Sequence, residues 1–256
     1  GHGGRAPTPL LVDPVRHSVQ EVGDVALLLA QAAPTAVSGS DRLAGARLAL
    51  AEGASHIVMD DGFQNPSLHK DVSVLVVDRA VGIGTGNVLP AGPLRAPRAP
   101  QLARADALLL VGPAPDPDTR PALAEAADAA GLLLLEGRLE PDADAIAQLK
   151  GCPLSAFAGI GRPEKFFQML VDEGLALYAS KAFADHHPFT PGEMSALAGE
   201  ADKMGWTLVT AEKVAARLAG PAFDALRPDI SVVPVTLRLS EEEALDTLID
   251  RAEARA

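Results

Sequence analysis

The sequence predicts an α/β fold made of a larger and a smaller α/β domain. Short apolar runs, typical of buried parallel strands, alternate with stretches of helical spacing. The same order begins again near Gly151, where a second series of strand, loop and helix follows. We therefore expect a mostly parallel sheet with helices on both faces over residues 1–152, a smaller α/β domain over residues 153–238, and a terminal helix over residues 239–256 that returns to the first domain.

The first domain is expected to open with a short strand over residues 9–12 and two helices over residues 18–33 and 41–53. Apolar side chains recur at helical spacing in the first of these helices. Asp41 can accept an N-cap hydrogen bond in the second helix, and Gly53 suits its end.

Apolar strands separated by a helix and a long loop complete this domain. The expected strands cover residues 57–59, 73–78, 107–111 and 132–135, and the expected helix covers residues 120–130. Residues 82–100 are rich in Gly and Pro and have no apolar period, and a loop of that length is more often functional than idle. Arg95 lies in this loop on a backbone stiffened by proline, where its side chain could meet a phosphate.

The second domain is expected to follow the same strand, loop and helix order. Its predicted elements are a strand beginning at Ala156, helices over residues 162–171 and 191–204, a loop over residues 183–189, and strands over residues 207–210 and 230–237. The closing run over residues 241–256 has Leu245, Leu248 and Ile249 on one helical face, which predicts an amphipathic surface helix.

Two adjacent carboxylates, Asp60 and Asp61, follow the short apolar run over residues 57–59. A buried parallel strand would deliver them to the carboxyl edge of a sheet, where ligands bind, and Gly62 would permit a turn there. Mg²⁺ needs only one or two protein carboxylates beside phosphate oxygens, so this pair suits a metal-phosphate site. Solvated acids at the end of a strand are the alternative interpretation.

Composition excludes several classes of protein. The chain has 256 residues, 48% of them hydrophobic, and a formal net charge of −12, which argues against a large nucleic-acid interface. No apolar run reaches the roughly 18 residues needed to span a bilayer, and the start has no secretory signal pattern. Cys152 is the only cysteine, so an internal disulfide is impossible. We expect a soluble chain in a reducing cytoplasm.

Several short stretches, in this order and spacing, are specific in combination. They are Gly1-His2-Gly3-Gly4, Val22-Gly23-Asp24, Met59-Asp60-Asp61-Gly62-Phe63-Gln64-Asn65, Leu89-Pro90-Ala91-Gly92-Pro93-Leu94-Arg95, Phe157-Ala158-Gly159-Ile160-Gly161-Arg162-Pro163, Asp185-His186 and Thr210-Ala211-Glu212-Lys213. Through them the chain resembles the tetraacyldisaccharide 4'-kinases, which phosphorylate the lipid A precursor. The resemblance runs nearly end to end and implies a P-loop NTPase-like fold.

The resemblance also implies a reaction: phosphoryl transfer from ATP, with Mg²⁺, to a sugar hydroxyl. Asp24 corresponds to the family's general base, and His186 to the histidine that pairs with it. Arg95 corresponds to a cation near the transferred phosphate, where positive charge stabilises the oxygens on which charge accumulates. Without the family context, Asp24 is a solvated helix charge and His186 an ordinary loop histidine.

Further site residues are implied in the same way. Asp60 and Asp61 correspond to acids that organise Mg²⁺ and nucleotide, with Gln64 nearby. On the substrate side the resemblance implies the residues Arg42, Gly3 and Gly4. The implied partner is the lipid A precursor disaccharide, met by a cytoplasmic protein bound peripherally to the cytoplasmic face of the bacterial inner membrane, and no nucleic acid partner is implied.

The sequence departs from the family pattern in places. No G-x-x-x-x-G-K-[ST] motif, the Walker A phosphate loop, occurs in these residues. Because that loop supplies most contacts to the β- and γ-phosphates, we expect that residues 1–256 alone do not turn over ATP. Val25, Ala96 and Val214 stand where the family usually has acids.

Two alternative functions remain open from the sequence. The first is a non-catalytic member of the family that keeps the lipid-sugar site without phosphoryl transfer. The second is an unrelated Mg²⁺-dependent phosphotransferase or phosphohydrolase that uses Asp60 or Asp61 as nucleophile.

Overall fold

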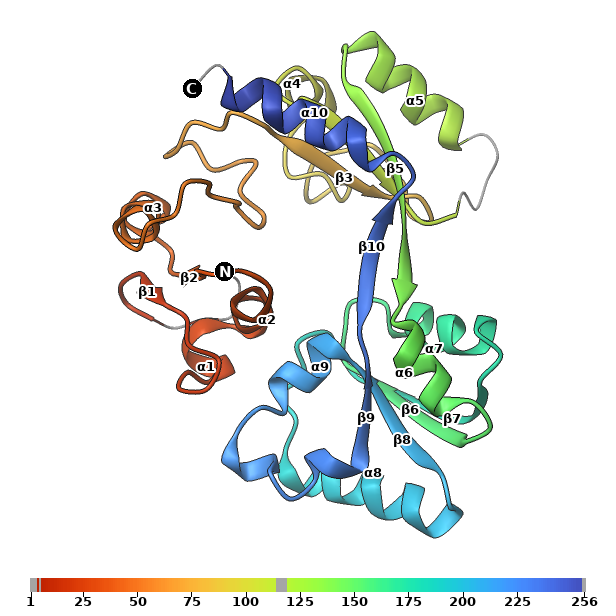
Figure 1. Cartoon of the computed structure of the whole chain (residues 1–256). Helices are drawn as coiled ribbons and strands as arrows, with labels where there is room; N and C mark the ends of the chain where they lie inside the picture. Colours follow the sequence, from red (N-terminus) through yellow and green to blue (C-terminus); the bar gives the residue numbers. More distant parts are fainter. Residues whose placement is uncertain (1–3, 5, 114–118, 255–256) are drawn as a thin grey trace. The chain divides into compact units, whose positions relative to one another are not determined.

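The structure is a computed structural model that describes residue 4, residues 6–113 and residues 119–254. Contacts divide the chain into two units (Figure 1). The first comprises Gly1–Gly62 and Pro141–Val235, and the second comprises Phe63–Glu140 and Thr236–Ala256. No helix within the described ranges is long and apolar enough to cross a membrane.

The first unit is built on a four-stranded parallel sheet in the order β7-β6-β8-β9. Its elements from residue 141 onward are α6 (Ala143–Leu149), β6 (Pro153–Ala158), α7 (Pro163–Asp172), β7 (Ala176–Ala182), α8 (Pro191–Met204), β8 (Thr207–Ala211), α9 (Glu212–Arg217), two 3-10 turns (Pro221–Phe223 and Arg227–Asp229) and β9 (Ile230–Val233). Before them come β1 (Leu10–Leu11), α1 (Val19–Val22), α2 (Asp24–Ala32), β2 (Val37–Ser38) and α3 (Arg42–Ala51), with β1 and β2 paired antiparallel.

Each face of this sheet is covered by two helices, because alternate strand residues point to opposite faces. Leu154, Ala156 and Val209 pack against α6 and α7, whereas Phe157 and Leu208 pack against α8 and α9. Figure 1 shows the two helix layers around the sheet. The core of the first unit therefore has two apolar layers separated by the sheet.

The second unit contains a four-stranded sheet in the order β10-β5-β4-β3, of which β3, β4 and β5 are parallel. Its elements are β3 (Val74–Asp78), α4 (Arg98–Leu102), β4 (Ala107–Val111), α5 (Thr119–Ala129), β5 (Leu133–Pro141), β10 (Val235–Leu239) and α10 (Glu242–Glu253). Leu245 and Leu248 of α10 pack against Leu109 and Leu135 on one face. Helices α4 and α5 contribute to the cluster on the other face.

The predicted α/β class is confirmed, whereas the domain boundaries expected at residues 152 and 238 differ from the division by contacts. Residues 1–62 join the later part of the chain because α2 packs against α9. The terminal helix α10 packs on β4 and β5, strands that lie within residues 1–152.

The strand predicted over residues 57–59 is wrong. The backbone there forms no strand, and Val58 is 95% exposed. The short apolar run joins none of the sheets formed by the described residues. The turn after it also differs, since Asp61 adopts the left-handed conformation, with φ of 51°. The turn conformation is thus taken by Asp61 and not by Gly62. A side chain at Gly62 is instead excluded by close packing, because an added Cβ would come within 2.6 Å of the Met59 Cβ.

Two other predicted elements are interrupted. The helix expected over residues 18–33 is split into α1 and α2 at Gly23, whose φ of 88° and ψ of 152° cannot continue a helix. The strand expected over residues 230–237 is split into β9 and β10 at Pro234, which has no N–H for a sheet hydrogen bond. Elements β2, α4, α6, β7 and α9 were not predicted, and α4 begins within the loop expected over residues 82–100.

A glycine pair tests the break between α1 and α2. Gly23→Ala should lower the free energy of unfolding by about 1–3 kcal/mol, because its backbone conformation is nearly restricted to glycine. Gly199→Ala is the matched control: this residue lies inside α8, and an added Cβ would meet nothing within 4 Å. That change should stabilise the protein by about 0.5–1 kcal/mol. Urea unfolding of both variants measures the difference, and equal effects would contradict the strained turn.

Candidate functional site

The site begins at Asp24, the first residue of α2. It follows the turn at Gly23, and its side chain is only 3% exposed. Its Oδ1 accepts a hydrogen bond from the backbone N–H of Val25 at 2.9 Å. A negative charge in the first turn of a helix is stabilised by the helix dipole. Asp24 is therefore a buried carboxylate held at a helix N-terminus, not a solvated helix charge.

Arg217, at the end of α9, is the buried partner of this carboxylate. Its Nε donates to Asp24 Oδ2 at 2.8 Å, and its Nη1 donates to the carbonyl oxygen of Gly159 at 2.5 Å. The side chain is 4% exposed. The guanidinium therefore ties α2 to the loop that follows β6 as well as to its own helix.

His186 meets the same carboxylate from the loop between β7 and α8. The distance from its Nδ1 to Asp24 Oδ2 is 3.1 Å, although the two residues are 162 apart in sequence. Unlike Asp24, the imidazole is 45% exposed. The backbone of His186 is left-handed, with φ of 56°, and its N–H donates to Asp185 Oδ1 at 2.9 Å. One edge of the ring thus faces a buried acid while the rest remains accessible.

More charges surround the accessible side of this ring. The Oδ2 of Asp185 lies 3.7 Å from His186 Nε2, which is too far for a hydrogen bond. The Oδ1 of Asp185 lies 3.9 Å from Lys213 Nζ and 4.0 Å from Arg217 Nη2. The two carboxylates that flank the imidazole, Asp24 and Asp185, are thus each paired with a cation.

The loop that carries His186 is anchored at its far end. His187 Nε2 lies 3.0 Å from Glu193 Oε1, and Glu193 forms a capping box with Thr190 at the start of α8. Phe183 packs edge-on against Phe189, with ring centroids 5.0 Å apart. These contacts fix the loop on both sides of His186.

The electrostatics of Asp24 follow from burial and from its cationic neighbours. Burial raises the pKa of the Asp24 carboxyl, but the hydrogen bond from Arg217, the charges of Arg217 and Lys213 and the N–H of Val25 outweigh it. The pKa of Asp24 is therefore lowered, and the carboxylate stays ionised at neutral pH.

A second group of predicted residues lies elsewhere in the first unit. Arg42 opens α3, and its Nη2 donates to the backbone carbonyl of Asp60 at 3.3 Å. Asp60 and Asp61 are exposed neighbours in the turn. Among the described residues, no group of three or more His, Cys, Asp or Glu side chains could hold a metal ion. Two adjacent carboxylates nonetheless fit Mg²⁺ when phosphate oxygens and water complete its shell.

Of the two glycines predicted on the substrate side, Gly3 and Gly4, the structure describes only Gly4. Gly4 lies against the end of α1, where an added Cβ would come within 2.9 Å of the Val22 carbonyl carbon and oxygen. Gly4 therefore lies close to the turn that precedes Asp24. Gly3 lies outside the described residues.

Gln64 and Arg95 belong to the second unit. Gln64 Nε2 donates to Gln101 Oε1 at 3.0 Å, and Gln101 Nε2 donates to the carbonyl oxygen of Ala96 at 2.7 Å. Gln101 thus links the segment after Gly62 to the residue that follows Arg95. Gln64 therefore contributes to the geometry of the loop that carries this cation.

Arg217 was not predicted from the sequence, and Lys213 was noted only as part of a motif. The available signal was a single arginine within the Ala-rich run that follows Glu212-Lys213, which is also typical of a solvated helix. Its partner Asp24 lies 193 residues away.

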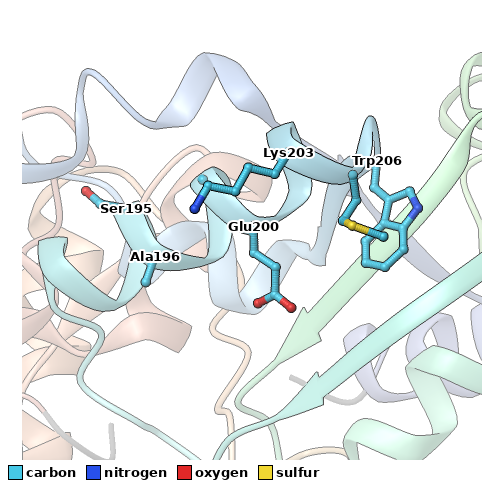
Figure 2. A pocket seen from close by; sticks show the side chains of 7 residues that line it. Ser195, Ala196, Glu200, Lys203 and Trp206 are labelled. Carbon is cyan, nitrogen blue, oxygen red and sulfur yellow. The ribbon is translucent and has the colours of Figure 1, made fainter.

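A shallow hollow on α8 involves none of the predicted site residues. Figure 2 shows Ser195, Ala196, Glu200 and Lys203 along the helix and Trp206 beyond its end. Trp206 stacks on Tyr178, with ring centroids 6.1 Å apart. The hollow is separate from the Asp24 cluster.

Comparison with known proteins identifies the family. The family model for LpxK, tetraacyldisaccharide-1-P 4'-kinase, matches residues 1–254. The chain belongs to the LpxK family. Two tetraacyldisaccharide 4'-kinases are similar to it: one from Xanthobacter autotrophicus is 60% identical and one from Azorhizobium caulinodans is 52% identical, each matched over 100% of this chain and 75% of the relative.

A solved structure supports the same assignment. The crystal structure of an LpxK from Aquifex aeolicus in complex with ATP has 27% sequence identity and a TM-score of 0.69 with this chain, covering 98% of this chain and 76% of that one. The resemblance noted from the sequence motifs is thus confirmed, and the LpxK family is a family of kinases.

The buried pair gives stability a pH dependence. Because the pKa of Asp24 is lowered in the folded state, its ionisation stabilises the fold above the ordinary Asp pKa of about 3.9. This contribution is lost as pH falls from that value through the folded-state pKa. Asp24→Asn should lower the free energy of unfolding at pH 7 by about 3–5 kcal/mol, since Arg217 is left buried without its counter-charge.

The same variant should show a weaker fall in stability on acidification than the wild type. Denaturant unfolding at pH 7 and near pH 3 measures both effects. Asp202→Asn, an exposed change on α8, is the matched control and should have little effect. Equal pH slopes for the wild type and Asp24→Asn would contradict the stabilising pair.

Proposed function

We propose that this protein carries out the reaction for which its family is named: ATP-dependent phosphorylation of the 4'-hydroxyl of a tetraacyldisaccharide 1-phosphate, a lipid A precursor. The observation that carries the proposal is the 3.1 Å contact between His186 and Asp24, with Arg217 buried behind it. A sugar hydroxyl is a poor nucleophile, and it must lose its proton as its oxygen bonds to the γ-phosphorus.

Asp24 and His186 act as one proton-accepting unit in this proposal. The carboxylate orients the imidazole, and the pair lies where the loop over residues 183–189 is anchored on both sides. Holding the hydroxyl in line with the phosphoryl group contributes most of the catalysis in this class of reaction.

The other predicted residues serve the nucleotide and the sugar. Asp60 and Asp61 would hold Mg²⁺, which neutralises charge on the phosphate oxygens when bound. Arg95 supplies positive charge near the transferred phosphoryl group, and Gln64 supports the loop that carries it. Arg42, Gly3 and Gly4 would contact the sugar substrate.

The proposed substrate, an acylated disaccharide, indicates where the enzyme acts. A disaccharide with four acyl chains resides in a membrane, so we place the enzyme in the cytoplasm, bound peripherally to the cytoplasmic face of the inner membrane. Support comes from the substrate named for the family.

A finer part of the proposal concerns residues 1–256 alone, which contain no Walker A motif. Without backbone N–H groups, a lysine and a hydroxyl around the β- and γ-phosphates, transfer loses most of its electrostatic stabilisation. A polypeptide of these residues is therefore proposed to bind the lipid sugar without phosphorylating it. The family match removes the unrelated phosphotransferase as an alternative.

Phosphate transfer tests this finer part. A polypeptide of residues 1–256, incubated with Mg²⁺, γ-labelled ATP and the disaccharide 1-phosphate, should give no labelled lipid, because its phosphate contacts are incomplete. The same polypeptide should co-sediment with vesicles that contain the disaccharide. Labelled lipid from this polypeptide would refute the finer claim while supporting the kinase assignment.

A second experiment uses a form that includes a Walker A segment. Asp24→Ala and His186→Ala should each lower kcat by about 10²–10⁴-fold, and the double variant should be little worse, since groups that act as a unit are non-additive. His69→Ala, an exposed histidine of the second unit, is the control and should keep full activity. Additive losses would show that Asp24 and His186 do not act together.

A further inference from the structure

The side-chain amide of Gln101 lies between two segments that carry predicted site residues. Its Nε2 donates to the carbonyl oxygen of Ala96 at 2.7 Å, and its Oε1 accepts from Gln64 Nε2 at 3.0 Å. Ala96 directly follows Arg95, and Gln64 lies three residues after Asp61. One amide therefore contacts both the loop of the predicted phosphate-binding cation and the segment that follows the predicted Mg²⁺ ligands.

The loop before Arg95 is closed by its own backbone, but the residue after Arg95 is not held in this way. The N–H of Leu94 donates to the carbonyl oxygen of Asn87 at 3.1 Å. The backbone of Ala96, in contrast, forms no hydrogen bond with another backbone group in the described part of the chain. The bond from Gln101 thus holds a point next to Arg95 that the loop itself leaves unfixed.

Gln101 is itself held by the core of the second unit. It belongs to α4, and the next residue, Leu102, packs against the cluster that contains Leu108 and Leu110. Gln101 is half-buried, whereas Gln64 is exposed. Holding an exposed glutamine in one rotamer costs conformational entropy. The hydrogen bond to an anchored side chain offsets this cost and gives Gln64 a preferred arrangement.

The chemistry of the three groups determines which way each amide faces. A backbone carbonyl can only accept, so Gln101 must present its NH₂ group to Ala96. The Gln101 oxygen then faces Gln64, which must donate from its own NH₂ group. The carbonyl oxygen of Gln64 is consequently turned away from Gln101, where it can accept a hydrogen bond from a ligand.

We propose that Gln101 is a positioning residue for phosphoryl transfer: it holds Gln64 with its oxygen turned outward and holds the backbone beside Arg95 before the nucleotide binds. This inference rests on the proposed kinase function, from which the nucleotide-side roles of Gln64 and Arg95 come. In this role Gln101 acts through Gln64 and Ala96 and need not touch the substrate. Groups that are already in place lose less entropy when the ligand binds and reacts.

The first test needs neither nucleotide nor lipid. Nitrogen-15 NMR of residues 1–256 reports how fast each side-chain NH₂ group exchanges with water, and Gln64→Met and Gln101→Met identify the two signals. In Gln101→Lys the ammonium can still donate to Ala96 but cannot accept from Gln64. The Gln64 NH₂ group should therefore exchange several-fold faster in Gln101→Lys than in the wild type. An unchanged exchange rate would overturn the proposed orientation.

A matched glutamine controls for the loss of a surface hydrogen bond. Gln168 Nε2 donates to Asp172 Oδ1 at 2.8 Å on α7, in the first unit. Gln168→Met should leave the exchange of the Gln64 and Gln101 signals unchanged. Faster exchange of these signals in Gln168→Met would show that the effect is not specific to Gln101 and would overturn the assignment.

The second test uses a form that includes a Walker A segment. Gln101→Met should raise KM for ATP and lower kcat, together lowering kcat/KM for ATP by about 10–30-fold, as expected for the loss of two ordinary hydrogen bonds. KM for the disaccharide should not change, because both partners of Gln101 serve the nucleotide. A smaller fraction of folded enzyme would lower kcat alone, so the change in KM for ATP reports positioning and not stability.

A double-variant cycle tests whether Gln101 acts through Gln64. Gln64→Met and Gln101→Met together should cost less than the product of the two single losses, since they remove one shared bond. Gln168→Met should keep the wild-type kcat/KM. Losses that simply multiply, or an unchanged KM for ATP in Gln101→Met that is folded by circular dichroism, would overturn the inference and leave the kinase function intact. No phosphorylation by the unsubstituted Walker A-containing form would overturn both, even where NMR shows the expected amide orientation.

Discussion

The buried ion pair between Asp24 and Arg217 constrains the whole first unit. Removing two charges from water costs several kcal/mol for each ion, and their attraction offsets this only when the remaining hydrogen bonds are good. Here Val25 and Gly159 supply such bonds. An apolar pair of similar size would often be as stable, so stability alone does not explain the charges. The position of the two charges offers an explanation, because the pair joins α2 to α9 beside the imidazole of His186.

The parallel sheet explains why these distant residues meet. Gly159 directly follows β6, His186 lies in the loop after β7, and Arg217 closes the helix after β8. Adjacent parallel strands end at one edge of a sheet, which is where α/β proteins bind ligands. Helix α2 then brings Asp24 to the same edge through its contact with α9. The site is therefore a consequence of topology, completed by a single buried charge from the N-terminal part of the chain.

The sequence predicted those elements whose signals are local. Strand β4 and helix α8 have the predicted bounds, and Asp41 caps α3 by accepting from the Ala44 N–H at 3.0 Å. The strand at residues 57–59 failed because an apolar run does not reveal whether a neighbouring strand is available for pairing. Arg217 was missed for a similar reason: burial of an arginine depends on a partner 193 residues away, which no periodicity records. Asp24 and His186 were found only through a family motif.

In the proposed phosphoryl transfer, Asp24 has a role that is compatible with its burial and its negative charge. A carboxylate whose pKa is lowered is a weak base, so it gains little by taking the proton itself. In a loose transition state the hydroxyl proton leaves late, and placement of the nucleophile matters more than the strength of the base. In the proposed reaction, Asp24 therefore orients His186, which it contacts at 3.1 Å, and Arg217 holds Asp24 through a hydrogen bond of 2.8 Å.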